Sequence, residues 1–514
     1  MDAFLLSARQ GDLASGPTFA EDKFMISSLT RAAAVLALVG SSAWSGMRAS
    51  RPTPPRVSVE GGMLEGGVDS ATGVVVFRGI PYAAPPVGRL RWRPPERAAR
   101  WTGVRRADQL GKNCVQTQIY GDIDPFAAGV SEDCLYLNVW TTELSTAAAP
   151  RPVMVWIHGG GFRAGFGGEE RHNGARLAQK GAVVVTLNYR LGPLGFLAHP
   201  ALAAESPRHS SGNYGLLDQI AALQWVRRNI SRFGGDPARV TVFGESAGGM
   251  SVGALIASPL AKGLFHRAIL ESGTGIGFGI RGRDSAFAQG VQFAELLGAV
   301  GKGRNAAAQL RATNAETLFA ALRPPPNGPP PNPLAFLPVV DGWVLPLPVD
   351  SALLQRRANL VPVLVGSNGD EDAGVFGAPA RAFARLVAAR HVPAYLYLFT
   401  RAGEDSASRA RGAYHSAEIT FVFGRPRPLL ELAGHAAYDS TLAEAMSDYW
   451  VAFATNGDPN GPPTAGRWPR WPEYDSTREA YIELGPEIAA RTEPRKALYD
   501  SLDNIARSRG GIRP

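Results

Sequence analysis

A serine at position 246 stands in a setting that suits a covalent nucleophile. Val240–Phe243 has the composition of a short buried strand, Gly244–Gly248 (GESAG) follows at once, and an Ala/Gly/Met/Val/Leu-rich helix comes next. A turn this tight has no room for bulky neighbours, and it pushes the Ser246 hydroxyl out to where a base can reach it. The five-residue pattern alone is weak, but the strand and the helix around it supply the context that such a motif needs.

A run of three glycines is the second chemical feature. His158–Phe162 (HGGGF) directly follows the apolar segment Val153–Ile157. Unshielded backbone N–H groups at a strand end can stabilise the negative charge that develops on a substrate oxygen. A phosphate-binding loop would instead need Lys and Ser or Thr after the glycines, and Phe162-Arg163 does not fit. A plain glycine-rich turn is the remaining alternative.

A serine nucleophile requires a base and an acid that orients the base. In strand–turn–helix enzymes these follow the serine in the order Asp or Glu, then His. Among the eight histidines, His415 lies in the polar stretch Gly412–Ile419 after an expected strand at 394–399. This position suits a base, although it does not by itself distinguish His415 from a structural histidine. A free imidazole titrates near pH 6.5, so such a base predicts activity that rises through that region.

Three consecutive carboxylates precede that histidine. Asp370, Glu371 and Asp372 follow an expected strand at 361–365. Open α/β sheets bind ligands at the carboxyl ends of their strands, so this loop is placed to supply the acid. A solvated acidic loop is the alternative interpretation.

The elements that would position these residues alternate between strands and helices along the chain. Expected strands lie at 153–157, 182–187, 239–243, 266–271, 361–365 and 394–399, and expected helices at 216–233 and 441–455. Several strands are continuously apolar, as in a sheet covered on both faces. This alternation predicts a single α/β domain with a mostly parallel sheet and helices on both sides.

Charge does not indicate a nucleic-acid partner. The formal net charge is +8, but the 53 basic residues include only six lysines, and they are scattered. A nucleic-acid footprint would require clustering.

The first 49 residues have the pattern of an export leader, with Met25 as the expected start. A short basic segment up to Arg31, an apolar stretch at 32–40 and the small residues Ser41–Ala43 follow in that order. This stretch is too short to span a bilayer, so we expect a secreted or periplasmic protein without stable membrane insertion. A disordered tail with an accidental apolar patch is the alternative. The catalytic domain would then occupy residues 50–514.

Only two cysteines occur, Cys114 and Cys134. An even number in an exported chain predicts one disulfide. Two free buried thiols in a cytosolic protein are the alternative.

Taken together, the chain resembles the type-B carboxylesterase/lipase family, which includes carboxylesterases, cholinesterases and para-nitrobenzyl esterases. The resemblance runs from about residue 56 to residue 500. It is carried by Phe77–Ala83 (FRGIPYA), Ser131–Asn138 (SEDCLYLN), His158–Phe162 (HGGGF), Asn188–Gly192 (NYRLG), Phe233–Pro237 (FGGDP), Gly244–Gly249 (GESAGG) and Gly457–Asn460 (GDPN).

The resemblance implies an α/β-hydrolase fold and a role for each site residue. It places the nucleophile on Ser246, the acid on Glu371 and the base on His415. It places the oxyanion donors on the backbones of Gly160, Gly161 and Ala247, the family's first disulfide on Cys114–Cys134, and a structural ion pair on Arg78 and Glu132. The implied reaction is ester hydrolysis through an acyl-enzyme, with a small-molecule ester as partner and no metal or organic cofactor. The resemblance fixes neither the oligomeric state nor the natural substrate.

Three departures from the family pattern stand out. Ser416 follows His415 where the family has glycine, and Asp372-Ala373 stands where the acid motif has glycine. Only 44 positions separate Glu371 from His415, whereas the family has a longer helical insert there. The missing insert predicts an open pocket and a preference for short-chain esters. Because fold does not fix function, a non-catalytic binding module or an impaired enzyme is the alternative.

Overall fold

A computed structural model describes residues 53–118, 128–144, 149–299, 304–322, 336–425, 436–462, 464–492 and 495–508. The expected leader lies outside the described residues. So do the stretch at 324–333, whose seven prolines predict a loop, and Tyr120 and Phe126, the aromatic residues between Cys114 and Cys134. The chain from Thr53 onward forms one compact unit. None of the helices described in that unit is long and apolar enough to cross a membrane.

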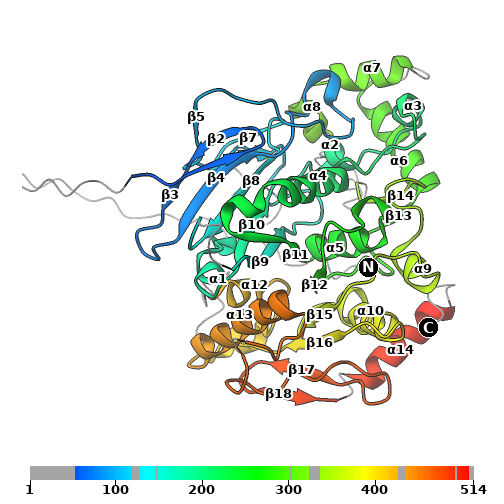
Figure 1. The fold of residues 1–514 in the computed structure, drawn as a ribbon. Helices are drawn as coiled ribbons and strands as arrows, with labels where there is room; N and C mark the ends of the chain where they lie inside the picture. Colours follow the sequence, from blue (N-terminus) through cyan, green and yellow to red (C-terminus); the bar gives the residue numbers. More distant parts are fainter. Residues whose placement is uncertain are drawn as a thin grey trace, which may run out of the picture. The chain divides into compact units, whose positions relative to one another are not determined.

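A large mixed sheet forms the centre of this unit (Figure 1). Its strands are Gly67–Val68 (β3), Val75–Pro81 (β4), Tyr136–Thr141 (β8), Arg151–Ile157 (β9), Val183–Leu187 (β10), Gly235–Glu245 (β11), Arg267–Glu271 (β12), Val363–Asn368 (β15), Ala394–Phe399 (β16), Tyr481–Leu484 (β17) and Ile488–Arg491 (β18). Their spatial order is β18-β17-β16-β15-β12-β11-β9-β10-β8-β4-β3. The seven strands from β17 to β10 run parallel, and the flanking strands pair antiparallel.

Smaller sheets lie beside the central one. They comprise Arg56–Val59 (β1), Gly62–Glu65 (β2) and Val104–Arg106 (β5); Asn113–Cys114 (β6) and Val130–Ser131 (β7); and Arg281–Gly282 (β13) and Val339–Val340 (β14).

Fourteen α-helices occur among the described residues. They are Ala175–Gln179 (α1), Gly192–Phe196 (α2), Pro200–Glu205 (α3), Tyr214–Asn229 (α4), Ala247–Ala257 (α5), Arg283–Leu296 (α6), Arg304–Ala312 (α7), Ala315–Ala320 (α8), Val349–Leu354 (α9), Ala378–Ala388 (α10), Ser406–Arg411 (α11), Ile419–Val422 (α12), Asp439–Asn456 (α13) and Lys496–Ser508 (α14).

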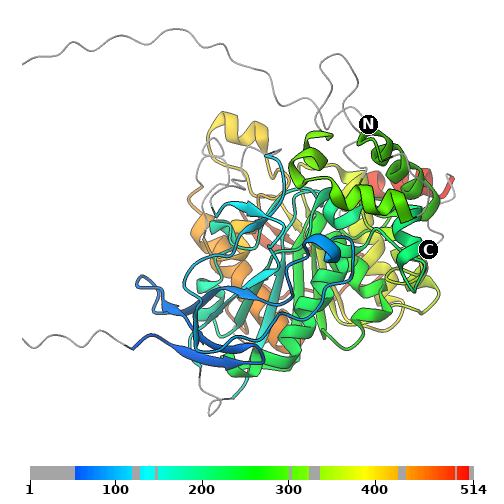
Figure 2. The same cartoon turned by 90° about the horizontal axis from the view of Figure 1, so that it is seen from above.

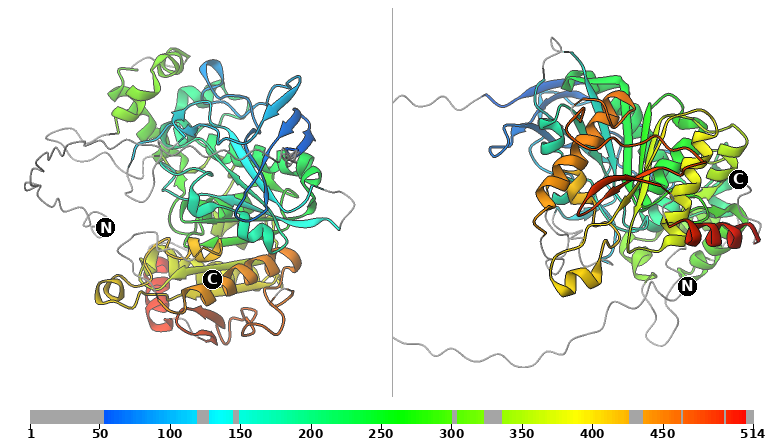
Figure 3. Two further views of the ribbon diagram at one scale, coloured as in Figure 1. Left: turned by 90° about the vertical axis from the view of Figure 1, so that its left-hand side faces the viewer. Right: turned by 90° about the horizontal axis from the view of Figure 1, so that it is seen from below.

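Alternation along the strands divides the core into two apolar layers. On β9, Val153, Val155 and Ile157 belong to the core that also holds the buried side chains of α4, α5 and α10. Met154 and Trp156 belong instead to the core that holds those of α1, α12 and α13. Successive side chains of a strand point to opposite faces, so a continuously apolar strand requires helices on both. The helices lie on opposite sides of the strands from above (Figure 2) and from below (Figure 3, right).

The predicted α/β architecture is therefore confirmed, and the expected elements form close to their expected bounds. The expected helix at 216–233 is α4 followed by a short 3₁₀ turn, Ile230–Phe233. The expected helix at 441–455 is α13, which ends at Gly457 in the left-handed conformation that glycine favours (φ 77°).

Candidate active site

Ser246 lies at a sharp turn between β11 and α5. Its backbone has φ 55° and ψ −119°, which a residue with a side chain adopts only under strain. The surrounding packing leaves no room for a side chain at Gly244, two residues before Ser246, or at Gly248, two residues after it. A Cβ on Gly244 would lie 2.5 Å from the carbonyl oxygen of Ile157, and one on Gly248 would lie 2.0 Å from the same oxygen. The predicted strand–turn–helix elbow is thus confirmed in its geometry.

The triple-glycine loop passes directly beside this serine. Gly160 and Gly161 have φ 94° and 62°, and a Cβ on the preceding Gly159 would lie 3.3 Å from the Cβ of Ser246. The carbonyl oxygen of Gly160 accepts the N–H groups of Arg163 and Ala164, both at 3.0 Å, which closes the loop. On the other side of Ser246, Ala247 begins α5, where N–H groups lack partners within the helix.

His158 supports this loop from within the core. Its Nδ1 lies 2.9 Å from the carbonyl oxygen of Gly159, and its ring stacks on Tyr189 at a centroid distance of 4.4 Å. Burial lowers the pKa of His158 to about 4. A buried neutral imidazole in this position serves the loop and does not reach Ser246 as a base.

The imidazole that does reach Ser246 is that of His415. Its Nε2 lies 2.9 Å from the Oγ of Ser246, and its Nδ1 lies 2.6 Å from Oε2 of Glu371. The His415 side chain is 32% exposed, whereas that of Glu371 is 1% exposed. Phe376 stacks on the imidazole at a centroid distance of 4.4 Å. The three residues therefore form one hydrogen-bonded line that solvent can reach at its histidine.

The acid loop and the histidine loop are joined by several further hydrogen bonds. Asn368 donates its backbone N–H to Glu371 and its side-chain amide to the carbonyl oxygen of Tyr414, both at 2.8 Å. Asp370 accepts the N–H of Ala413 on its carboxylate and donates its own N–H to the carbonyl of Ala413. These bonds fix the direction in which His415 presents its ring.

Three buried carboxylates act on the histidine, those of Glu245, Glu371 and Glu418, and a fourth, that of Glu271, acts on Glu418. Of the four, only Glu371 was predicted from sequence as a site residue. Glu245, Glu271 and Glu418 are each at most 2% exposed. Burial raises the pKa of all three, that of Glu271 to about 8 although the indole N–H of Trp450 donates to it. Burial opposes the charged form of His415, but the carboxylates of Glu245 and Glu371 outweigh that effect and raise its pKa to about 9. The carboxylates therefore favour the protonated imidazole of His415 relative to that of a free histidine.

A single sequence gives only a weak signal for these glutamates. Glu245 and Glu418 lie within the motifs that carry Ser246 and His415. Glu271 ends the apolar strand β12, and a carboxylate at the end of a strand buried on both faces has to be accommodated without water. That signal points to a buried acid but does not say what it faces.

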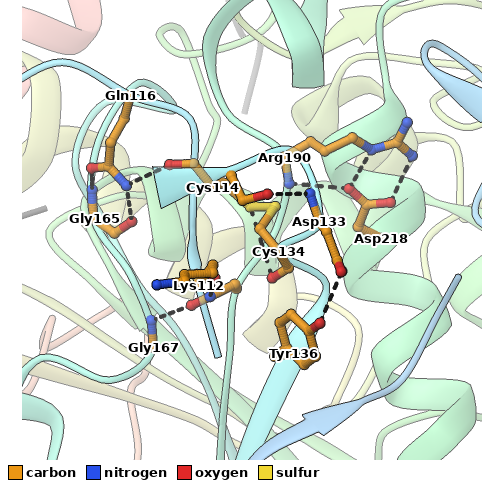
Figure 4. Close-up of a disulfide and its surroundings, with 12 residues drawn as sticks. Lys112, Cys114, Gln116, Asp133, Cys134, Tyr136, Gly165, Gly167, Arg190 and Asp218 are labelled. Carbon is orange, nitrogen blue, oxygen red and sulfur yellow. Dashed lines mark hydrogen bonds and ion pairs between the residues drawn. A yellow bond between two sulfur atoms is a disulfide. The ribbon is translucent and has the colours of Figure 1, made fainter. Parts of the chain in front are cut away.

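The predicted disulfide is present, and the loop that it closes contacts the segment after the triple glycine. Cys114 and Cys134 are bonded and lie beside the buried ion pair of Arg190 and Asp218 (Figure 4). Gln116, two residues after Cys114, bonds both the N–H and the carbonyl of Gly165, at 2.8 and 3.0 Å. The disulfide loop therefore holds the segment that follows the triple glycine.

The predicted ion pair of Arg78 with Glu132 is wrong. Glu132 instead forms a bidentate pair with Arg91, whose side chain is 8% exposed and also donates to the carbonyl of Thr313. Arg78 lies on β4 and donates its backbone N–H to Ala107, and its charge acts on Asp108. The resemblance placed the arginine in the motif Phe77–Ala83, whereas the arginine that packs against Glu132 follows the short turn Gly88–Leu90 after that motif.

Within the described part of the chain, no group of three or more His, Cys, Asp or Glu side chains has an arrangement that could hold a metal ion. What the site offers is a hydroxyl, an imidazole that can accept its proton, a carboxylate that can stabilise the resulting cation, and unshielded N–H groups nearby. That set suits acyl transfer.

Comparison with known proteins gives a consistent result. The carboxylesterase family model matches residues 53–375 and 372–501. The chain is 38% identical to fumonisin B1 esterase of Sphingopyxis macrogoltabida, with 85% of this chain and 89% of that protein covered. It is 35% identical to para-nitrobenzyl esterase of Bacillus subtilis (87% and 98% covered) and 33% identical to carboxylesterase 1D of Rattus norvegicus (87% and 92% covered). A solved structure of PNB esterase superposes with a TM-score of 0.77 at 33% identity, covering 88% of this chain and 99% of that one.

Proposed function

This chain belongs to the carboxylesterase family and is a carboxylic ester hydrolase, and from that premise we propose that it acts through a covalent acyl-enzyme on Ser246. The observation that carries the proposal is the hydrogen-bonded line from Ser246 through His415 to Glu371, with distances of 2.9 and 2.6 Å. A family member that served only as a binding module would not require a serine, a histidine and a glutamate hydrogen-bonded in this order.

Each group has a distinct part in the proposed reaction. His415 takes the proton of Ser246 as the hydroxyl attacks the ester carbonyl, and it later gives that proton to the departing alcohol. Glu371 orients the imidazole and stabilises its cation. The backbone N–H groups of Gly160, Gly161 and Ala247 hold the negative oxygen of the tetrahedral intermediate. Water, activated by the same histidine, then hydrolyses the acyl-enzyme.

We propose short-chain esters as the preferred substrates. The interval between Glu371 and His415 holds one full helix, α10, together with strand β16 and the short α11. Fewer helices there leave less apolar surface to hold an acyl chain, and each buried methylene is worth about 0.8 kcal/mol. The relatives are named for esters as different as fumonisin B1 and para-nitrobenzyl esters, so their names do not decide the acyl length.

The test is hydrolysis of p-nitrophenyl acetate, butyrate, octanoate and palmitate by wild type and by Ser246→Ala. We expect kcat/KM to be highest for the short esters and turnover to vanish in the variant while its circular dichroism spectrum is unchanged. A steep rise toward octanoate or palmitate would contradict the short-chain preference alone. Turnover that survives in Ser246→Ala would contradict the proposed nucleophile.

A further inference from the structure

Ser416, the residue after His415, has a backbone conformation that disfavours a side chain. Its φ is 71°, in the left-handed region that glycine occupies without cost. The family pattern has glycine at this place. Ser416 therefore adopts an unfavourable backbone conformation. Unlike glycine, however, it has a hydroxyl group at this position.

That hydroxyl contacts the carboxylate nearest to the reacting atoms. Ser416 Oγ donates to Oε1 of Glu245 at 2.6 Å. The same Oε1 lies 3.2 Å from Nε2 of His415, which itself lies 2.9 Å from the Oγ of Ser246. Nε2 thus faces two oxygens, and Ser416 holds one of them.

We propose that Ser416 is a positioning residue that holds Oε1 of Glu245 beside Nε2 of His415, so that Glu245 assists Glu371 in stabilising the imidazolium formed during acylation. The proposal rests on the proposed function of the site, because the imidazolium arises when His415 takes the proton of Ser246. Ser416 touches neither the substrate carbonyl nor the proton, and it acts only through Glu245.

The charges around Glu245 decide the direction of the effect. Burial raises the pKa of Glu245, and the nearby charge of Glu371 raises it further, whereas His415, the Ser416 hydroxyl and Arg171 lower it. Glu418, which accepts a hydrogen bond from the side-chain amide of Asn368, also raises the pKa of His415. Glu271, bonded to Trp450, raises the pKa of Glu418. Without the hydroxyl, Glu245 shifts toward its protonated form. A neutral carboxyl group stabilises the imidazolium less than a carboxylate does.

Two variants remove the hydroxyl but differ in backbone strain. Ser416→Gly suits φ 71° and relieves the strain, whereas Ser416→Ala retains it. For both we expect the acid limb of kcat/KM against pH to move to lower pH by roughly half a unit or more, because a charge-assisted hydrogen bond is lost. The plateau of kcat with p-nitrophenyl acetate should fall about threefold to tenfold. If Ser416→Gly has the profile and kcat of wild type while Ser416→Ala is impaired, the serine acts on the backbone and the proposal fails.

Glu245→Gln provides the coupling test. It should move the acid limb in the same direction, and adding Ser416→Gly to it should produce no further shift. Shifts that add independently in the double variant would show that Ser416 does not act through Glu245.

A second readout separates this proposal from the proposed function. NMR titration of ¹³C-labelled histidine, with the His415 signal assigned by its loss in His415→Gln, reports imidazole protonation without any turnover. A wild type that hydrolyses no ester would remove the proposed function, yet the titration would still decide Ser416. A lower His415 midpoint in Ser416→Gly supports the contact described here, and superimposed titrations overturn it.

Discussion

The three consecutive carboxylates of the acid loop have three different partners. Glu371 contacts His415, Asp370 accepts the N–H of Ala413, and Asp372 accepts the N–H groups of Gly374 and Val375 at the start of the next helical turn. The residue types alone give all three the same chemistry, and it was the family resemblance that placed the acid on Glu371. Of the three, Glu371 is the one within hydrogen-bonding distance of His415.

Replacing Glu371 should therefore have a far larger effect than replacing its neighbour. We expect Glu371→Gln to lose kcat by roughly 10³-fold to 10⁴-fold, because an amide cannot stabilise the imidazolium in the required tautomer. Asp370→Asn keeps an oxygen that can accept from Ala413 and should cost little. Steady-state kinetics on p-nitrophenyl acetate would measure both, and the reverse ranking would move the acid to Asp370.

The pH dependence should reflect the carboxylates around His415. The base must be neutral to accept the proton of Ser246, and its pKa is raised to about 9 by Glu245 and Glu371 against the opposing effect of burial. Activity should accordingly be low where a free imidazole is already half neutral, roughly pH 6.5, and kcat/KM should still be rising toward pH 9. A kcat/KM that is already flat at pH 7 would show that these charges do not act on His415.

At the scale of elements, ion pairs connect the C-terminal helix α14 to α10, the helix that follows the loop of Glu371. Arg381 of α10 is fully buried and pairs with Glu479, and with Asp500 and Asp503 of α14, at 3.2, 2.9 and 2.7 Å. Its guanidinium also lies over the ring of Tyr499, whose hydroxyl sits so close to Gly377 that a Cβ there would be 2.3 Å away. The Arg381 cluster thus supports the segment that carries Phe376 against His415.

Removing this arginine should destabilise the whole unit. In Arg381→Met the buried Glu479 would lose Arg381 but keep Arg385, so we expect a loss of about 1.5–3 kcal/mol, less than when a buried charge is left without any partner. Urea denaturation followed by fluorescence would measure the loss. Arg491→Met is the matched control, because Arg491 pairs only on the surface and its loss should leave the midpoint unchanged. Equal midpoints for both variants would contradict a structural role for the Arg381 cluster.

Sequence reasoning recovered the elements whose pattern is local and missed those that depend on distant partners. The apolar strands β9, β10 and β11 were predictable because a strand buried on both faces has a continuous apolar run. The short strands β1, β2 and β5 were not anticipated, since three or four residues carry too little periodicity. The predicted partner of Glu132 was wrong for a related reason: Arg78 and Arg91 are both far from it in sequence, and only the packed chain shows which one faces the carboxylate.

The same contrast applies to the active site. Ser246, Glu371 and His415 were predictable because each lies in a recognisable motif, and the distances between them follow from the fold. The contacts of Glu245 and Ser416 were not, because they arise where the elbow after β11 meets the loop after α11, 171 residues apart. Ser416 appeared from sequence as a mild departure, and only its φ and its bond to Glu245 give it a specific role.

At the scale of the whole molecule, the hydrogen-bonded line of Ser246, His415 and Glu371 is assembled at the carboxyl ends of parallel strands. Ser246 follows β11, Glu371 follows β15, and His415 comes after β16 and α11, while β12 lies between β11 and β15 in the sheet. Ligands bind at this edge of open α/β sheets, where loops from several strands converge. The position of the site is thus a consequence of strand order as well as of motif.

Export of the whole chain remains a proposal, supported by the leader pattern from Met25 and by the disulfide of Cys114 with Cys134. The mature protein should begin shortly after residue 43, and thiol titration of the denatured, unreduced protein should find no free thiol. N-terminal sequencing and a thiol-reactive dye would measure both. An intact N-terminus together with two free thiols would place the protein in a reducing compartment.

The central claim is that Ser246 forms a covalent bond with the acyl group, and active-site labelling tests it most directly. The protein is treated with a fluorophosphonate, digested, and mapped by mass spectrometry. We expect one adduct, on the peptide that contains Ser246, and none in Ser246→Ala that retains the wild-type circular dichroism spectrum. An adduct on another residue, or equal labelling of Ser246→Ala, would contradict the account.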